Sequence, residues 1–352
     1  LKPDFGFLKN DTHLFLLLFI TFNALSVTNS GLYLNKSLSA LSLKWCKYLF
    51  IFIVVENTLS TQQRLRNAIF VVLFIGMLIG LDTLSQQFFN IDFIRHRPLI
   101  DGRVTATFEN RNSLAVYLVP TALVITAFAL GQTKRRFLIP LSLAILLLGA
   151  SLILTFSRSA WLGFFVGLTM ILIMSYVAKK RTVAIYSASM ILVFVISLLL
   201  VPAVRQKLIF TLSPGGDAFR IPLGLTAIKM IQENPFLGKG VGTFMSNFLA
   251  HSNIGTSEPF YAHNCFLQIW AETGIFSLLS FLAFAGLIVY QTISAFKKSS
   301  EFLCLGLACA IVGYLVNSFF EVSLYSLQLA FLFWLFMGLA GAAINAAKAN
   351  TI

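Results

Sequence analysis

A histidine and two arginines are the residues of this sequence best suited to chemistry. His263 ends a long, mostly polar loop and begins an apolar stretch, and Arg220 lies earlier in that loop. Arg158 separates two apolar runs in the segment TFSRSAW, where a charge costs free energy unless it has a partner or a function. Histidine suits proton transfer near neutral pH, and arginine suits an anionic ligand. These residues predict a site that binds an anion and moves a proton.

Three further polar residues follow His263 with helical spacing. Asn264, Gln268 and Glu272 are four residues apart, which places them on one face of the helix predicted to begin here. Polar groups in a membrane helix normally face the protein interior or a water-filled cavity. The stripe therefore has two interpretations. It either caps a helix end, or it lines an interior cavity with His263 at the rim.

The glycine-rich segment LGKGVGTF, residues 237–244, could bind phosphate through its backbone N–H groups. It lacks the GxxxxGK[ST] spacing of a P-loop and no strand precedes it, so a tight turn is the favoured interpretation. The sequence also lacks DxD and HExxH motifs, and its four cysteines form no CxxC pair. We therefore expect neither a metal ion nor another cofactor.

The composition indicates that membrane-spanning helices position these residues. Of the 352 residues, 58% are hydrophobic and 11% are charged, whereas a soluble domain carries roughly 25% charged residues. This predicts a polytopic membrane protein with one helix bundle, residues 1–352, and the lipid bilayer as a partner. The net charge of +13 would suggest nucleic acid in a soluble protein. In a membrane protein, basic cytoplasmic loops explain the charge first, so no nucleic acid is expected.

Ten stretches are apolar over enough residues, about 20, to cross a bilayer. Backbone groups in lipid must pair within their own segment, which favours α-helices over barrel strands here. The predicted fold class is therefore all-α, a polytopic helix bundle. Its spans are expected near residues 14–34, 43–59, 66–89, 112–130, 137–156, 159–178, 183–204, 263–293, 302–320 and 324–346.

Short basic connectors predict the orientation of the bundle. Residues 60–67, 131–136, 178–182 and 294–301 are rich in lysine and arginine, and all four lie on one side of a ten-span chain. The positive-inside rule makes that side cytoplasmic. The two long loops, residues 90–111 and 205–262, are then expected on the outer side, together with the candidate site.

Positive charge also occurs in these outer loops, where basic residues outnumber acidic ones. Solvated side chains account for Lys207, Lys229 and Lys239, because long loops tolerate positive charge on the outer side. Asp82, near the outer end of the third span, is a candidate ion-pair partner for an outer arginine. An anionic ligand is the functional explanation for the arginines that remain.

Part of the long outer loop is expected to be helical. Residues 219–231 carry apolar side chains at helical spacing, at Ile221, Leu225 and Ile228. The dipeptide Asn234-Pro235 ends the pattern. The loop therefore predicts a short amphipathic helix on the membrane surface, followed by the glycine-rich turn.

Several stretches together resemble a known family. They are GRVTATFENRNSLAVYLVP (102–120), LTFSRSAWLGFFVG (154–167), RIPLGLTAIKMIQENPFLGKGVGTF (220–244) and HNCFLQIWAETG (263–274). Over about residues 38–345 the chain resembles the O-antigen ligase/polymerase superfamily, whose members are inner-membrane glycosyltransferases of the GT-C type. Ligases of this kind typically have twelve spans, so a pair of N-terminal spans is expected to precede this sequence.

The resemblance implies roles for the matching residues. Arg158 and Arg220 would hold the diphosphate of an undecaprenyl-linked glycan, and His263 would act on the acceptor hydroxyl. Four further substrate-binding candidates lie in or beside the matching stretches: Arg103, Asn112, Tyr261 and Asn264. The expected reaction transfers a preassembled O-antigen glycan from undecaprenyl diphosphate to lipid A–core. It would take place on the periplasmic side of the bacterial inner membrane, without a metal ion and with inversion.

Other functions stay open. A polymerase, which uses another lipid-linked glycan as acceptor, or a protein O-oligosaccharyltransferase of the same superfamily would share these motifs. A transporter or flippase of lipid-linked glycan would explain the basic outer loops and the polar stripe, but it predicts charged residues distributed through the membrane depth. An integral scaffold predicts that alanine at Arg158, Arg220 or His263 changes nothing.

Overall fold

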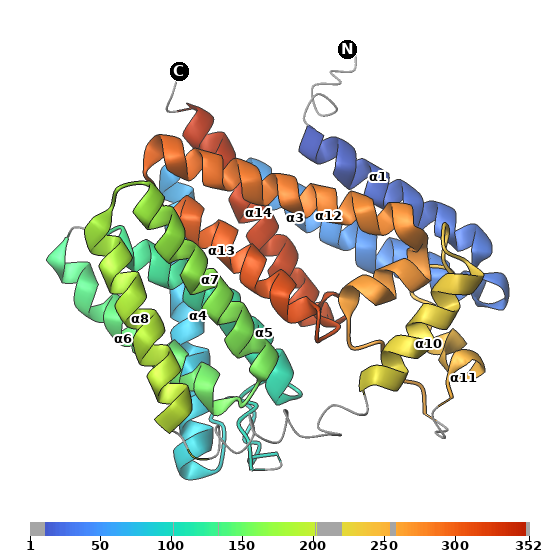
Figure 1. The fold of residues 1–352 in the computed structure, drawn as a ribbon, viewed down its shortest axis with the longest axis horizontal. Helices are drawn as coiled ribbons and strands as arrows, with labels where there is room; N and C mark the ends of the chain where they lie inside the picture. Colours follow the sequence, from blue (N-terminus) through green and yellow to red (C-terminus); the bar gives the residue numbers. More distant parts are fainter. Residues whose placement is uncertain are drawn as a thin grey trace. The chain divides into compact units, whose positions relative to one another are not determined.

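The computed structural model describes residues 11–349 except 101, 133, 201, 203–219 and 254–257. In these residues the chain is helical almost throughout, and the only strand-like pairing is one bridge between Ile100 and Arg103. Figure 1 shows the helices α1 (Asp11–Ser26), α2 (Leu34–Ala40), α3 (Cys46–Thr58), α4 (Gln62–Phe89), α5 (Arg111–Leu130), α6 (Arg135–Leu154), α7 (Arg158–Val177), α8 (Arg181–Leu200), α10 (Arg220–Glu233), α11 (Phe244–His251), α12 (Cys265–Ser299), α13 (Phe302–Ser318) and α14 (Leu327–Ala349).

The predicted all-α, multi-span fold is confirmed. Within the described ranges, nine segments are long and apolar enough to cross a membrane, and the shorter apolar helix Phe302–Ser318 corresponds to the remaining predicted span. The second span is longer than expected. It runs over Gly31–Thr58, because α2 continues through a π-helical turn at Leu41–Trp45 into α3.

The chain divides into two compact units. The first, which we call the loop unit, comprises Leu1–Phe52, Pro214–Ile288 and Ser318–Trp334. The second, the bundle unit, comprises Ile53–Ser213, Val289–Asn317 and Leu335–Ile352. Each is described by itself.

Glycines let the helices of the bundle unit pack closely. A methyl group on Gly163 of α7 would lie 2.5 Å from the carbonyl oxygen of Gly313 in α13 and 3.6 Å from Val119 of α5. A methyl group on Gly167 would lie 2.3 Å from Leu123 of α5. Small residues are what allow membrane helices this approach. The two contacts with α5 also show that α5 and α7 run parallel.

The basic connectors gather at one end of the bundle unit. Gly131, which follows α5, packs against Phe302 at the start of α13, so residues 131–136 and 294–301 are neighbours. Because α7 runs parallel to α5, residues 178–182 after α7 lie at this end as well. Gln62 of the connector 60–67 lines one pocket with Lys298. The predicted grouping is therefore seen, and its cytoplasmic orientation stays a prediction.

The loop 90–111, which is predicted to lie on the outer side, is held by two polar side chains of α4. The Oδ1 atom of Asp82 accepts hydrogen bonds from the backbone N–H groups of Phe93, at 2.8 Å, and Ile94, at 3.2 Å. The Oε1 atom of Gln86 accepts from Thr105 and Ala106, both at 2.7 Å. The expected pairing of Asp82 with an outer arginine is not seen among the described residues, where its hydrogen-bond partners are backbone amides.

A break in α12 organises the loop unit. Gly274 has φ 82° and ψ 172°, so the helix is interrupted there and its last carbonyl groups before the break have no helical partner. The glycine-rich turn supplies the donors: Lys239 N–H bonds the Ala271 carbonyl and Gly240 N–H bonds the Glu272 carbonyl, both at 2.9 Å. In return, Ile275 N–H donates to the Pro235 carbonyl at 3.0 Å. The glycine-rich turn thus packs against α12 at the break and supplies hydrogen-bond donors to it.

The polar stripe of α12 serves the same contact. The buried Glu272 carboxylate accepts hydrogen bonds from the backbone N–H groups of Gly242, at 2.7 Å, and Phe244, at 3.1 Å. Gln268 donates to Glu272 at 3.4 Å. Since protein acceptors already occupy the N–H groups of Gly240 and Gly242, these cannot cradle phosphate as the turn stands. The tight-turn interpretation is the one that the geometry favours.

The predicted helix in the long loop is α10, and it has two apolar faces. One face packs in a buried cluster of the loop unit, with Leu223, Ala227 and Met230 against Phe244 and Phe248 of α11. The residues that suggested an amphipathic helix lie on the other face and are exposed: Ile221, Leu225 and Ile228. Contact of this face with lipid stays a prediction.

Gly274→Ala is expected to destabilise the fold. The new methyl group would lie 1.8 Å from the Phe236 carbonyl oxygen, and the backbone conformation at this position is open essentially only to glycine. We expect the melting temperature of the purified protein to fall by about 5 °C or more. Gly286→Ala in the same helix is the control, because its methyl group would meet open space. Equal melting temperatures for the two variants would contradict the close contact between the glycine-rich turn and α12 at Gly274.

Candidate functional site

Two of the three predicted catalytic residues meet on one carboxylate in the loop unit. The Nη2 atom of Arg220 lies 3.1 Å from Oε1 of Glu321, and Nδ1 of His263 lies 3.6 Å from Oε2 of the same side chain. The first contact is a charge-assisted hydrogen bond. The second is too long for a hydrogen bond, and it becomes a charge contact only when His263 is protonated. The Glu321 carboxylate therefore lies next to both the Arg220 guanidinium and the His263 imidazole.

Exposure differs among the three side chains. Arg220 and His263 are 34% and 33% exposed, whereas Glu321 is 11% exposed. The cationic and imidazole groups can thus be reached from outside, and the carboxylate lies beneath them. A negatively charged ligand would meet the arginine first.

His263 is placed by the start of α12. The side chain of Asn264 accepts hydrogen bonds from the backbone N–H groups of Phe266, at 2.9 Å, and Leu267, at 3.0 Å, which satisfies the first turn of the helix. His263 itself has φ 49°, a left-handed conformation that is uncommon outside glycine. Asn264 therefore has a clear capping role, and its predicted contact with substrate stays a prediction.

Glu321 is placed by a compact turn between α13 and α14. The Cys265 thiol donates to the Glu321 carbonyl oxygen at 3.1 Å, and the hydroxyl groups of Ser318 and Ser323 are 2.9 Å apart. The rings of Phe266 and Phe319 pack with centroids 4.4 Å apart. The first turn of α12, which follows His263, is thus joined directly to the segment that carries Glu321.

Two tyrosines lie near this group. The rings of Tyr261 and Tyr325 are 6.3 Å apart. Burial raises the pKa of Tyr261, and the nearby Glu272 charge adds to the shift. Burial raises the pKa of Tyr325 well above its ordinary value, again with a contribution from Glu272. Both phenols are therefore neutral near pH 7, so they are suited to donating hydrogen bonds and not to accepting a proton.

A second ionic cluster holds α10, the glycine-rich turn and α11 together. The Glu233 carboxylate pairs with Lys239 and, at 3.0 Å, with Nε2 of His251, while Lys229 bonds the His251 carbonyl oxygen at 3.2 Å. The hydrogen bond from Lys239, followed by that from His251, lowers the pKa of Glu233 to about 2. Lys229 and Lys239 were expected to be solvated, and instead they bind protein groups. Lys207 lies outside the described residues.

Arg158 belongs to the bundle unit, where it is the first residue of α7. The chain enters this helix through Phe156, which has φ 53°. The turn is held by the Trp161 indole N–H, which donates to the Leu152 carbonyl at 3.0 Å. Convergence of Arg158 with Arg220 and His263 stays a prediction.

The remaining candidates also lie in the bundle unit, except Tyr261. Arg103 pairs its backbone with Ile100 in a tight turn, through hydrogen bonds of 3.0 and 3.1 Å. Asn112 lies in the first turn of α5, which the side chain of Asn110 caps by accepting from Ser113 N–H at 2.9 Å. The structure thus shows how the backbone is held near Arg103 and near Asn112. Contacts of Arg103, Asn112 and Tyr261 with substrate stay predictions.

Glu321 is the residue that sequence reasoning missed. It is the single acidic residue between positions 302 and 352, and it lies between two apolar runs. An isolated carboxylate between membrane spans carries the same energetic argument as Arg158, so a signal was present. Its pairing with Arg220, a hundred residues earlier, depends on the tertiary structure.

The part of the chain that the structure describes contains no group of three or more histidine, cysteine, aspartate or glutamate side chains arranged to hold a metal ion. The free cysteines Cys265, Cys304 and Cys309 are buried singly. Metal independence of the reaction stays a prediction, which a chelator can test.

The chain is similar to known proteins over a range that includes the three candidate catalytic residues. A family model described as O-antigen ligase matches residues 143–282, a range that contains Arg158, Arg220 and His263. The chain is 26% identical over 200 residues to an O-antigen ligase of Salmonella typhimurium, covering 53% of this chain and 47% of that protein. It is also 26% identical over 259 residues to the teichuronic acid biosynthesis protein TuaE of Bacillus subtilis, covering 68% of this chain and 52% of that protein.

The aligned regions cover about half the length of these relatives. The matched family range holds the basic entry to α7, the helix α10, the glycine-rich turn and the break in α12, which are the elements that carry the predicted site. The motifs, the helical architecture, the family model and both relatives support the O-antigen ligase-like superfamily for this chain.

Proposed function

We propose that the protein is a glycosyltransferase of the bacterial inner membrane. It transfers a preassembled glycan from undecaprenyl diphosphate to the lipid A–core acceptor on the periplasmic side. The observation that carries this proposal is the pairing of Arg220 and His263 on Glu321, at 3.1 and 3.6 Å, in a chain of the O-antigen ligase-like superfamily. This pairing supports a site in which Arg220 binds an anion and His263 accepts a proton from one bound acceptor.

Arg220 is the proposed diphosphate ligand in the loop unit. Without donor, its guanidinium is neutralised by Glu321. When the donor binds, the guanidinium exchanges this carboxylate for phosphate oxygens, to which it can pair bidentately. Arg158 is the proposed second ligand. Charge that builds on the departing diphosphate is then stabilised by groups already in place, which is usually the largest contribution such a site makes.

His263 is the proposed general base. Its Nδ1 atom faces Glu321, so Nε2 is the nitrogen for the acceptor. As the acceptor oxygen attacks the anomeric carbon, the acceptor proton passes to Nε2 and the bond to the diphosphate oxygen breaks. The electron pair leaves with the diphosphate, and direct displacement inverts the anomeric carbon. Glu321, released by Arg220, then stabilises the imidazolium.

A second candidate is a polymerase, for which the acceptor is another lipid-linked glycan. The similarity to a teichuronic acid biosynthesis protein, over 259 residues against 200 for the O-antigen ligase, supports a glycan product other than O-antigen on lipid A–core. An assay with separate donor and acceptor decides between them. Transfer of labelled glycan to lipid A–core would support the ligase. Extension of lipid-linked glycan without labelling of lipid A–core would show that the protein is a polymerase.

Alanine at Arg158, Arg220 or His263 is expected to reduce glycan transfer by at least about 100-fold, because each variant removes a charge-stabilising or proton-accepting group. Transfer from purified lipid-linked donor is the measurement. Lys229→Ala is the matched control. It removes a cation from the same helix as Arg220, and among the described residues the Lys229 side chain bonds His251 and Asn253. Wild-type transfer by the three site variants would refute the site.

Glu321→Gln is expected to split the kinetic constants. Loss of the carboxylate frees Arg220 from its competitor, so the KM for donor should fall. It also removes the charge that stabilises the protonated His263, so kcat should fall by about 10-fold or more. Steady-state kinetics of transfer give both values. If Glu321→Gln lowers the yield of folded protein but leaves the KM and kcat of the folded fraction unchanged, Glu321 has only a structural role.

Transfer is expected to continue undiminished in EDTA. Two arginines can stabilise a departing diphosphate without a divalent cation. The measurement is the transfer rate in chelator, with a glycosyltransferase of known metal dependence assayed in parallel as the control. Loss of transfer in EDTA, restored by added Mg²⁺ or Mn²⁺, would overturn metal independence while leaving the arginine and histidine roles to be tested by substitution.

A further inference from the structure

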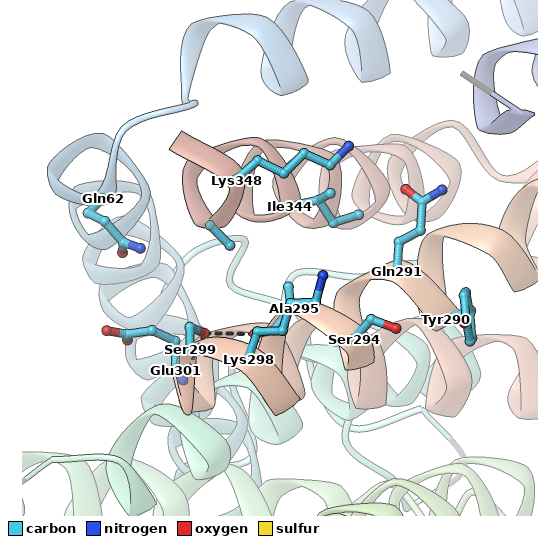
Figure 2. A pocket seen from close by; sticks show the side chains of 11 residues that line it. Gln62, Tyr290, Gln291, Ser294, Ala295, Lys298, Ser299, Glu301, Ile344 and Lys348 are labelled. Atoms are coloured by element: carbon cyan, nitrogen blue, oxygen red, sulfur yellow. Dashed lines mark hydrogen bonds between the residues drawn. The ribbon is translucent and has the colours of Figure 1, made fainter. Parts of the chain in front are cut away.

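A pocket unrelated to the candidate site lies at the basic end of the bundle unit. It has a volume of about 580 Å³ and is formed by the first turn of α4, the last turns of α12 and the last turns of α14. Figure 2 shows its lining side chains, which come from three segments far apart in the sequence. All three helices are long and apolar enough to cross a membrane, and the pocket lies at the ends of these candidate spans.

The lining combines two cations with neutral hydrogen-bonding groups. Lys298 of α12 and Lys348 of α14 contribute ammonium groups, and Gln62, Gln291 and Ser294 contribute amide and hydroxyl groups. Glu301 also lines the pocket, and in Figure 2 its carboxylate points away from the side occupied by Lys348 and Gln291. Two positive charges and one negative charge leave the lining with a net charge of about +1, which matches a phosphodiester.

The pocket also has an apolar wall. Ile344 and Ala347 of α14 and Ala295 of α12 face the same space. On the α12 side, Tyr290 lies about one helical turn before Ser294, and it is 68% exposed. A ligand that fits this lining has an anionic head and an apolar body beside it. Free inorganic phosphate would use only half of the surface.

Helix-end electrostatics alone do not explain the arrangement. Lysines in the last turns of α12 and α14 offset the negative ends of the helix dipoles. That explanation applies equally to Lys297 and Lys298, but only Lys298 lines the pocket. It also gives no reason for two amides and a hydroxyl group around the same space. Basic pockets between membrane helices are typical binding places for anionic lipid headgroups.

We propose that this pocket binds the phosphodiester headgroup of an anionic phospholipid, with Lys298 and Lys348 pairing with the phosphate oxygens. Gln62, Gln291 and Ser294 accept or donate hydrogen bonds to the rest of the headgroup, and the acyl chains follow the apolar wall. The site is independent of the glycan-transfer site, so neither proposal depends on the other.

Native mass spectrometry of the full chain in detergent, titrated with short-chain phosphatidylglycerol, tests the proposal. Wild type is expected to retain phosphatidylglycerol in preference to phosphatidylcholine. Lys298→Gln and Lys348→Gln should each bind phosphatidylglycerol about fivefold more weakly, and the double variant at least about tenfold more weakly. Lys297→Gln is the matched control, since it removes the neighbouring charge without touching the pocket. Circular dichroism confirms that each variant retains its helices.

Three results would overturn the assignment. Equal weakening by Lys297→Gln and Lys298→Gln would reduce the effect to surface charge. Wild-type binding by the double variant would remove the pocket from the interaction. Displacement of the lipid by glycerol phosphate at equal concentration would show that a soluble phosphate ester, and not a lipid, is the ligand.

Discussion

The organisation of the loop unit depends on the carbonyl groups of α12 that have no hydrogen-bond partner within the helix. A helix that breaks at Gly274 leaves carbonyl groups without partners, and in an apolar environment such groups are costly. The backbone of the glycine-rich turn meets this need at Ala271 and Glu272, and the Glu272 side chain binds the turn again. Because α10 directly precedes the turn, this contact fixes the helix that begins with Arg220 against the helix that follows His263.

The same contact explains why the turn contains glycine. A methyl group on Gly238 would lie 2.3 Å from the carbonyl carbon of Glu272, so a side chain there would separate the two backbones. Close backbone approach is a common reason for glycine. Here it brings the turn onto α12 and not onto a phosphate group. Glu321 completes the arrangement by supplying a counter-charge to Arg220, so that the cation is not left unpaired in the absence of donor.

Prediction from the sequence worked where the physics is local or periodic. The apolar stretches, the helical spacing in α10 and the stop at Asn234-Pro235 each depend on neighbouring residues. Most helices lie close to the expected bounds, whereas the second span begins at Gly31 and not near residue 43. It did less well where a side chain has two plausible partners. Asp82 was assigned to an arginine by charge, and the structure gives it backbone amides, because a folded loop offers donors that no sequence pattern displays.

The sequence by itself determined the all-α membrane fold, the basic end of the bundle, and the residue types of the candidate site, because hydrophobic length, charge bias and side-chain chemistry are properties of short segments. Only the tertiary structure decided that Glu321 joins Arg220 to His263, and that Glu272 of the polar stripe binds the glycine-rich turn. Those pairings connect residues 28 to 101 positions apart. Which distant groups meet is set by the packing of whole helices, and no single segment encodes it.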